Sequence, residues 1–155
     1  MTLLLQNRQR ARKINLRALR KITRYLLENL LEQNQFELAI HLVSPSEIAA
    51  LNETFLQHHG PTDVISFDYG KTKNKLRGEI FICLEVAVKQ ARQFRATWPS
   101  ELMRYIIHGI LHLEGFDDLY PPARKQMKRR ENLLLQKLHF QFSFNQLDAK
   151  KSSHK

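Results

Sequence analysis

The spacing of apolar residues along the chain predicts an alternation of strands and helices. Four segments have the length and apolar content of strands: 2–6, 36–42, 64–67 and 78–84. Five others place apolar residues three or four positions apart, as helices that bury one face do: 14–33, 45–56, 85–96, the segment after Ser100 and the segment after Pro121. The pattern therefore predicts an α/β (α+β) protein.

Local signals indicate how some of these elements begin and connect. The segment 44–47 reads Ser-Pro-Ser-Glu, a capping box in which Ser44 accepts from first-turn amides and Glu47 reaches back. Ser100 is predicted to cap a later helix. The polar loop 68–77 joins the third and fourth strands, which should therefore run antiparallel.

The chain length predicts one domain. A chain of 155 residues can bury a single core, and we predict that the domain spans 1–142. Periodicity is lost from Ser143 onward, and the chain ends Lys-Lys-Ser-Ser-His-Lys. The segment 143–155 is therefore predicted to be a basic, flexible C-terminal tail.

Positive charge is the most unusual property of the composition. The chain has 25 Lys and Arg against 15 Asp and Glu, a formal net charge of +10. The first 27 residues hold several cations and no acidic residue: Arg8, Arg10, Arg12, Lys13, Arg17, Arg20, Lys21 and Arg24. A polyanion, nucleic acid before an anionic membrane, is the expected partner. The alternative is that these cations form only a solvated helix face.

Cysteine content and hydropathy indicate the compartment. Cys83 is the single cysteine, so no intramolecular disulfide can form, which suits a reducing cytosol. No apolar run approaches the roughly 18 residues that a membrane span needs. We therefore expect a cytoplasmic protein that does not act at a membrane.

The strongest chemical signal is an apolar run that holds His108 and His112. Four residues apart, both imidazoles project from one face of a helix, which is how a helix presents two nitrogens to a metal ion. Gly115 can end that helix, after which the chain can fold back and bring Asp117 or Asp118 to the same ion. Two histidines and one carboxylate can bind catalytic zinc. The alternative is that both histidines are core residues.

The same stretch carries a family resemblance. His-Gly-Ile-Leu-His-Leu-Glu-Gly-Phe-Asp-Asp, at 108–118, resembles the signature His-Gly-x-Leu-His-Leu-x-Gly-Tyr-Asp-His of the YbeY family of bacterial rRNA-maturation endoribonucleases. The segment 51–67, which starts Leu-Asn and ends Pro-Thr-Asp-Val-Ile-Ser-Phe, is similar to the family's second marked stretch. Gly-Glu-Ile-Phe-Ile-Cys at 78–83 is similar to its Gly-Asp-Ile strand.

The resemblance implies a fold and an activity. The fold is a single domain in which a mixed four-stranded sheet packs with helices around a central, zincin-like His-x-x-x-His helix. The implied cofactor is one Zn²⁺ per chain, bound by His108, His112 and Asp118, the last standing where the family has a third histidine. The implied activity is single-strand-specific cleavage of RNA in maturation of the 16S rRNA 3′ end and in ribosome quality control. The partners would be rRNA and the small ribosomal subunit, with no small-molecule cofactor. The oligomeric state is unknown from the sequence, and a monomer is the default.

One departure from the family pattern concerns catalysis. In the family, an arginine implicated in activity follows the Leu-Asn-x-x-Tyr part of the second stretch. Its place is taken here by Leu56, which cannot pair with a phosphodiester. Arg77, His58 and His59 are candidates to replace it, because they lie in neighbouring loops. Asp63 is expected along the cleft by resemblance. The catalytic residues are thus unknown, with Asp63 and Arg77 as candidates.

Two other functions stay open. One is a non-catalytic, metal-containing rRNA-binding factor in ribosome assembly, which Leu56 favours. Gly109 favours it too, because metalloproteases have their general base, a Glu, at that place. The other is a zinc hydrolase of another substrate, such as a peptide. The charge of +10 and the same missing Glu argue against the hydrolase.

Overall fold

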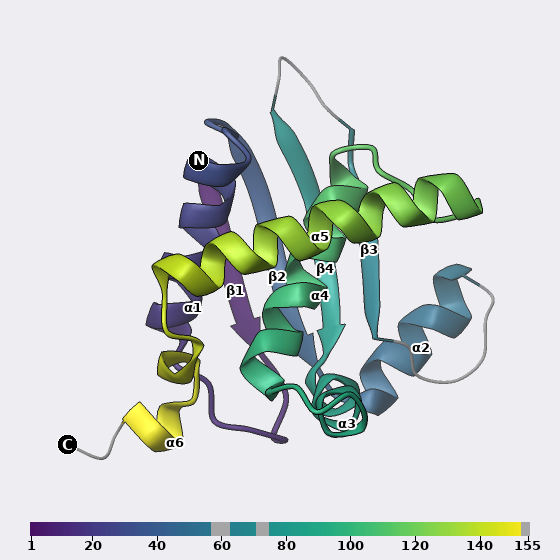
Figure 1. Ribbon diagram of the computed structural model, residues 1–155. Coiled ribbons are helices and arrows are strands. Elements are labelled where there is room, and N and C mark those ends of the chain that lie inside the picture. Colours follow the sequence, from purple (N-terminus) through teal and green to yellow (C-terminus); the bar gives the residue numbers. More distant parts are fainter. Residues whose placement is uncertain (57–62, 71–74, 153–155) are drawn as a thin grey trace.

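Four strands form one mixed sheet in the computed structural model, which describes residues 1–56, 63–70 and 75–152 (Figure 1). The strands stand in the order β1 (Thr2–Asn7), β2 (Phe36–Val43), β4 (Leu76–Cys83) and β3 (Val64–Asp68). β1 and β4 run parallel to β2, whereas β3 runs antiparallel to β4. The predicted mixed sheet, the edge strand at the N-terminus and the antiparallel pairing of β3 with β4 are confirmed.

Helices cover the sheet, with α4 against the strands and α5 crossing over α4 on the outside (Figure 1). Their bounds are α1 (Leu16–Tyr25), η1 (Leu26–Leu30), α2 (Pro45–Leu56), α3 (Leu84–Gln93), α4 (Trp98–Leu113), α5 (Pro121–Gln141), η2 (Phe144–Leu147) and α6 (Ala149–Ser152). The predicted helix 14–33 is α1 followed by the π-helical turn η1. Within the described residues, no helix has the length and apolar content to cross a membrane.

Two glycines let α4 lie close to the sheet. A Cβ on Gly109 of α4 would come within 2.8 Å of the Ile80 side chain on β4. A Cβ on Gly78 of β4 would come within 2.7 Å of the Leu113 side chain and 2.6 Å of the Phe67 carbonyl. Any larger residue would therefore push the helix away from the strands. This close packing fixes α4 as the buried central helix, as the sequence predicted.

The two faces of the sheet have different environments. Alternate residues of a strand point to opposite faces. Gly78 and Ile80 face α4 and the main core, whereas Phe81 and Cys83 pack on the other face with Ile48 of α2. Residues of β4 with odd numbers therefore lie across the sheet from α4.

Two helix starts differ in part from the sequence prediction. Thr97, rather than Ser100, caps α4: its hydroxyl accepts from the Ser100 amide at 3.3 Å. Pro99 therefore lies inside the first turn, where amides have no helical acceptor and proline is tolerated. At α2, Ser44 Oγ accepts from the Glu47 amide at 3.2 Å as predicted. The Glu47 carboxylate, however, binds Arg8 at 2.7 Å and so is not the second half of a capping box.

The prediction of a flexible tail from Ser143 is wrong for the residues that follow α5. Phe144 and Leu147 are 5% and 0% exposed and belong to the main core. Asp148 forms a β-bridge with Ile14. Residues three apart in a 3₁₀ turn lie on one side, so the two apolar side chains dock together although the turn is too short to show periodicity. Residues 153–155 lie outside the described residues.

Candidate metal centre

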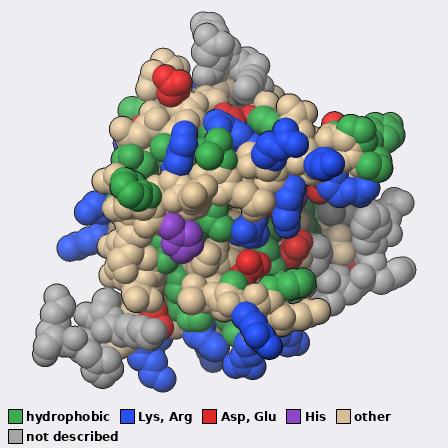
Figure 2. Space-filling view, in the orientation of Figure 1, with side chains coloured by type: hydrophobic (Ala, Val, Ile, Leu, Met, Phe, Trp, Pro, Cys, Tyr) green, Lys and Arg blue, Asp and Glu red, His purple; other side chains and the backbone are tan. Residues whose placement is uncertain are grey.

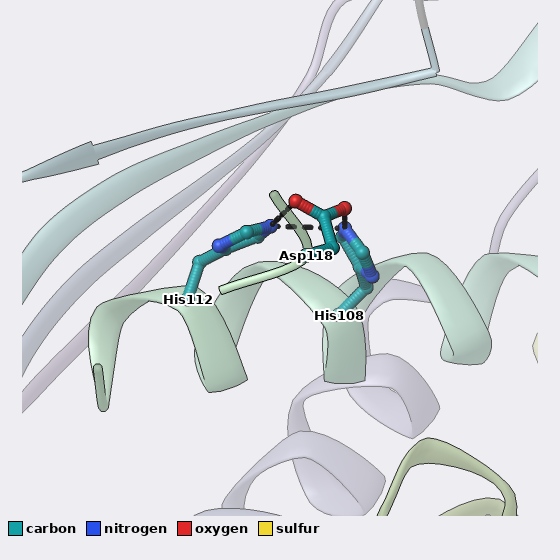
Figure 3. Close-up of side chains that lie close together, drawn as sticks. All are labelled: His108, His112 and Asp118. Atoms are coloured by element: carbon teal, nitrogen blue, oxygen red, sulfur yellow. Dashed lines mark hydrogen bonds and ion pairs between the residues drawn. The ribbon is translucent and has the colours of Figure 1, made fainter. Parts of the chain in front are cut away.

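The histidines of α4 meet as their spacing predicts. The Nε2 atoms of His108 and His112 are 3.1 Å apart (Figure 3). Asp118 faces them, with its two oxygens 3.7 Å from His108 Nε2 and 3.8 Å from His112 Nε2. Within the described residues, these three side chains are the group that could hold a metal ion, their ligand atoms all lying within 4.8 Å of one another.

A glycine turn brings Asp118 to the histidines. Gly115 has a φ of +106°, a conformation that residues with a side chain rarely adopt. Its amide donates to the His112 carbonyl at 3.0 Å, and the chain then reverses past the end of α4. Of the two candidate acids, Asp118 reaches the cluster, whereas Asp117 accepts from the Leu119 amide at 3.2 Å.

Both imidazole rings are held through Nδ1. His112 Nδ1 donates to the Phe116 carbonyl at 3.1 Å. His108 Nδ1 binds the carboxylate of Glu131 on α5. A histidine with Nδ1–H donated to an acceptor has its Nε2 lone pair free for a metal. Both Nε2 atoms therefore face Asp118 as potential ligands.

Glu131 is the site residue that sequence reasoning missed. It is 4% exposed, and Arg104 of α4 lies 3.6 Å from its second oxygen. On α5 it lies four residues after Met127 and three before Leu134, both buried, so it belongs to the apolar stripe. The sequence signal that could have identified Glu131 is an acidic residue among the apolar positions of a helix, because buried carboxylates are rare unless they are paired.

The carboxylates around His108 shift its pKa upward. Burial by itself would lower the pKa of His108. The hydrogen bond that His108 donates to Glu131, together with the negative charges of Glu131, Asp118 and Asp63, outweighs burial and raises the pKa of His108 above its ordinary value. The cluster therefore attracts positive charge, whether a proton or a metal ion.

The donor set fits a single tetrahedral metal ion. Nitrogen and oxygen ligands lie about 2.0–2.2 Å from zinc, which places neighbouring ligand atoms about 3.3–3.6 Å apart. Here the two Nε2 atoms are 3.1 Å apart, and they lie 3.7 and 3.8 Å from different oxygens of the Asp118 carboxylate. Three protein ligands are the number typical of catalytic zinc, whose fourth position takes water or substrate.

A cleft of about 610 Å³ opens beside the cluster, between α5 and the end of α3. His108 and Asp118 line it, together with Asp63. Arg124 and Lys128 of α5 supply basic side chains. In Figure 2, Lys and Arg side chains stand along α5, and acidic side chains lie in the hollow beside it. The arrangement suits a polyanion whose reacting group meets the metal ligands.

Comparison with known proteins agrees with this geometry. A family model described as Endoribonuclease YbeY matches residues 4–139. The chain belongs to the YbeY family. An Endoribonuclease YbeY of Chlorobium luteolum is 47% identical over 57% of this chain and 64% of its own length. One of Bacteroides fragilis is 42% identical over 64% of this chain and 70% of its own length.

A solved structure extends the likeness over more of the chain. The solution structure of a Thermotoga maritima protein has a TM-score of 0.65 at 27% identity. The match covers 88% of this chain and 89% of the other. By contrast, the Chlorobium luteolum match spans just under two thirds of that relative.

The candidate catalytic residues lie in different parts of the structure. Asp63 lies on the cleft beside His108, as the resemblance implied. Arg77 does not reach the cluster, because its odd position on β4 places it across the sheet, where it lies 3.6 Å from Glu37. The side chain of Leu56 lies outside the described residues, as do His58 and His59.

Proposed function

We propose that this chain is a zinc-dependent endoribonuclease specific for single strands, acting in maturation of the 16S rRNA 3′ end and in ribosome quality control. The observation that carries the proposal is the pair of Nε2 atoms, both aimed at Asp118 while their Nδ1 atoms are held by acceptors. Membership of the YbeY family supports RNA as the substrate. The proposal includes rRNA and the small ribosomal subunit as partners and the cytoplasm as the location.

Each group at the site has a distinct task in this proposal. Zinc, held by His108, His112 and Asp118, would polarise a phosphoryl oxygen or acidify a bound water. Glu131 keeps the His108 ring in the orientation that ligation needs. Asp63, which lines the cleft, would accept a proton from the attacking water.

The test is metal content measured together with cleavage. The purified wild-type chain should contain one zinc and cut a single-stranded rRNA fragment, whereas His112→Ala should contain no zinc and leave the RNA intact. His139→Ala is the matched control, because His139 belongs to α5 and bonds Ser100 rather than the cluster. A full equivalent of zinc in His112→Ala would overturn the site, and an intact fragment with zinc-loaded wild type would overturn the nuclease.

Leu56 favours a second function, an rRNA-binding assembly factor whose metal is structural. The family arginine is absent at that position, and Arg77 is across the sheet from the cluster. Under this function, wild type binds RNA without cutting it, and Leu56→Arg begins to cut. If wild type cuts and Leu56→Arg changes the rate little, the endoribonuclease stands and the role of the arginine has moved to other residues.

A further inference from the structure

The cleft beside the metal cluster has an exposed aromatic ring on one side. Phe94 directly follows α3 and is 66% exposed, although it lines the same cleft as His108 and Asp118. A large apolar ring in contact with water is a natural platform for an unpaired nucleobase. Every base has a π face, so such stacking requires no particular sequence.

The opposite wall carries cations that the protein itself does not neutralise. Arg124 and Lys128 are four residues apart and so lie on one face of α5, where both line the cleft. In the described part of the chain, no carboxylate forms an ion pair with either of them. The third cation of the cleft, Arg104, lies 3.6 Å from Glu101 and from Glu131. Arg124 and Lys128 therefore remain available to an external anion.

Helix stability does not explain the basic character of this part of α5. No acidic residue occurs between Asp118 and Glu131, and the first turn of the helix holds none. A carboxylate in the first turn would stabilise the helix, because it would meet the positive end of the helix dipole. The basic surface also continues outward, where Lys125 and Arg129 share a second hollow with Arg124 and Lys128.

A groove continues on the far side of the cluster. Ser66 of β3 and His112 of α4 line a hollow of about 330 Å³. His108 and Val64 line both this hollow and the larger cleft. A chain of nucleotides can therefore cross the metal ligands and find space on either side of them.

We propose that the cleft between Phe94 and α5 binds the single-stranded RNA on one side of the scissile phosphate. One base stacks on Phe94, while the phosphates along the opposite wall pair with Arg124 and Lys128. The stacked base must be unpaired, so Phe94 selects single strands over duplexes. This inference rests on the proposed function, because it takes RNA as the ligand of the cleft.

The test is binding of a labelled, unstructured 12-nucleotide RNA to the full-length chain by fluorescence anisotropy. Phe94→Ala should weaken binding at least about fivefold, since one base stack is lost, and should leave affinity for a duplex of the same sequence unchanged. Arg124→Gln with Lys128→Gln should reduce the slope of log affinity against log salt by about 1.4, from two lost phosphate contacts in a single strand.

Matched controls distinguish this binding path from nonspecific attraction of RNA to a basic protein. Phe140→Ala removes another exposed aromatic residue, which is 93% exposed near the end of α5. Lys89→Gln with Arg92→Gln removes two exposed cations, three apart on α3, that do not line the cleft. Both controls should bind the single strand as wild type does. The proposed path would be overturned if a control lost as much affinity as the cleft variant that it matches, or if Phe94→Ala lost no affinity for the single strand.

A gel of the RNA after each titration separates this inference from the proposed function. If wild type cuts the RNA while the cleft variants bind it as wild type does, the path is wrong and the nuclease stands. If wild type binds through Phe94 and α5 but never cuts, the path stands and the endoribonuclease is wrong.

Discussion

Two clusters that contain histidine lie on opposite faces of the sheet: the His41 cluster (His41, Glu79 and Tyr69) and the candidate metal centre. Of the two, the candidate metal centre has ring nitrogens available for a ligand. His41 of β2 is 6% exposed, and its ring stacks on Phe81 with 4.4 Å between centroids. Its Nε2 lies 2.7 Å from Glu79 Oε2, and its Nδ1 lies 2.9 Å from Gln6 Oε1. Both ring nitrogens are therefore occupied by partners within the fold.

His108 also binds a carboxylate, but through Nδ1 alone. Its Nε2 faces His112 and Asp118 instead, at the edge of an open cleft. A histidine–carboxylate pair is thus structural when both nitrogens have protein partners, and suited to ligation when one nitrogen meets other donors. The comparison predicts separate consequences for the two clusters.

The largest expected effect is on metal binding. His108→Ala should lose zinc completely, because two remaining ligands do not make a zinc site. His41→Ala should keep one zinc per chain and instead lose about 2 kcal/mol in free energy of unfolding, because it removes one of the two hydrogen-bond partners of Glu79 and leaves a space beside Phe81. Zinc analysis and urea unfolding of both variants check this. Loss of zinc from His41→Ala would contradict the conclusion that the His41 cluster has no part in metal binding.

The next effect is expected at Glu131. Glu131→Gln should weaken zinc binding about 10- to 100-fold, the usual cost of removing a carboxylate partner from a ligating histidine. Competition with a chromogenic chelator measures it. Asn132→Ala is the control, since Asn132 bonds Arg104 from the same turn of α5 but does not touch His108. Equal affinities for Glu131→Gln and wild type would show that Glu131 serves only to join α5 to α4.

Local sequence predicted most of the candidate metal site but not Glu131, which lies behind it. His108, His112 and Gly115 lie within one helix and its end, so periodicity and glycine chemistry were enough to place them. Asp118 was separated from Asp117 by the family resemblance. Glu131 is 23 residues beyond His108 on another helix, and its position depends on how α5 packs across α4. Such tertiary packing has no local signature.

Arg77 lies away from the cluster because β4 starts earlier than the sequence predicts. The sequence predicts a strand that starts at residue 78, with Arg77 in the preceding loop, from which it could reach the site. β4 begins at Leu76 instead, and β4 pairs Arg77 with Glu37 of β2. Once Arg77 belongs to the strand, alternation turns its side chain to the face opposite α4. Two residues of strand extension therefore turn the Arg77 side chain away from the cluster.

The smallest expected effect is the acid titration of the His41 cluster. The Tyr69 hydroxyl donates to Glu79 at 2.5 Å and, with His41, lowers the pKa of Glu79 against the opposing effect of burial. Because the pKa of Glu79 is lowered in the folded state, the Glu79 carboxylate stabilises the fold above its ordinary pKa of 4.5. That stabilisation is lost as pH falls through the folded-state pKa.

Urea unfolding between pH 3 and pH 7 should therefore measure a difference in free energy of unfolding between Glu79→Gln and wild type. That difference should be constant above about pH 5.5 and smaller at lower pH. Tyr69→Phe should move the acid loss to higher pH, because the pKa of Glu79 rises when its main donor is removed. Zinc content should stay at one per chain in both variants. A pH profile for Tyr69→Phe that coincides with wild type would exclude the hydroxyl as the cause, and a change in zinc would couple two clusters that the sheet keeps apart.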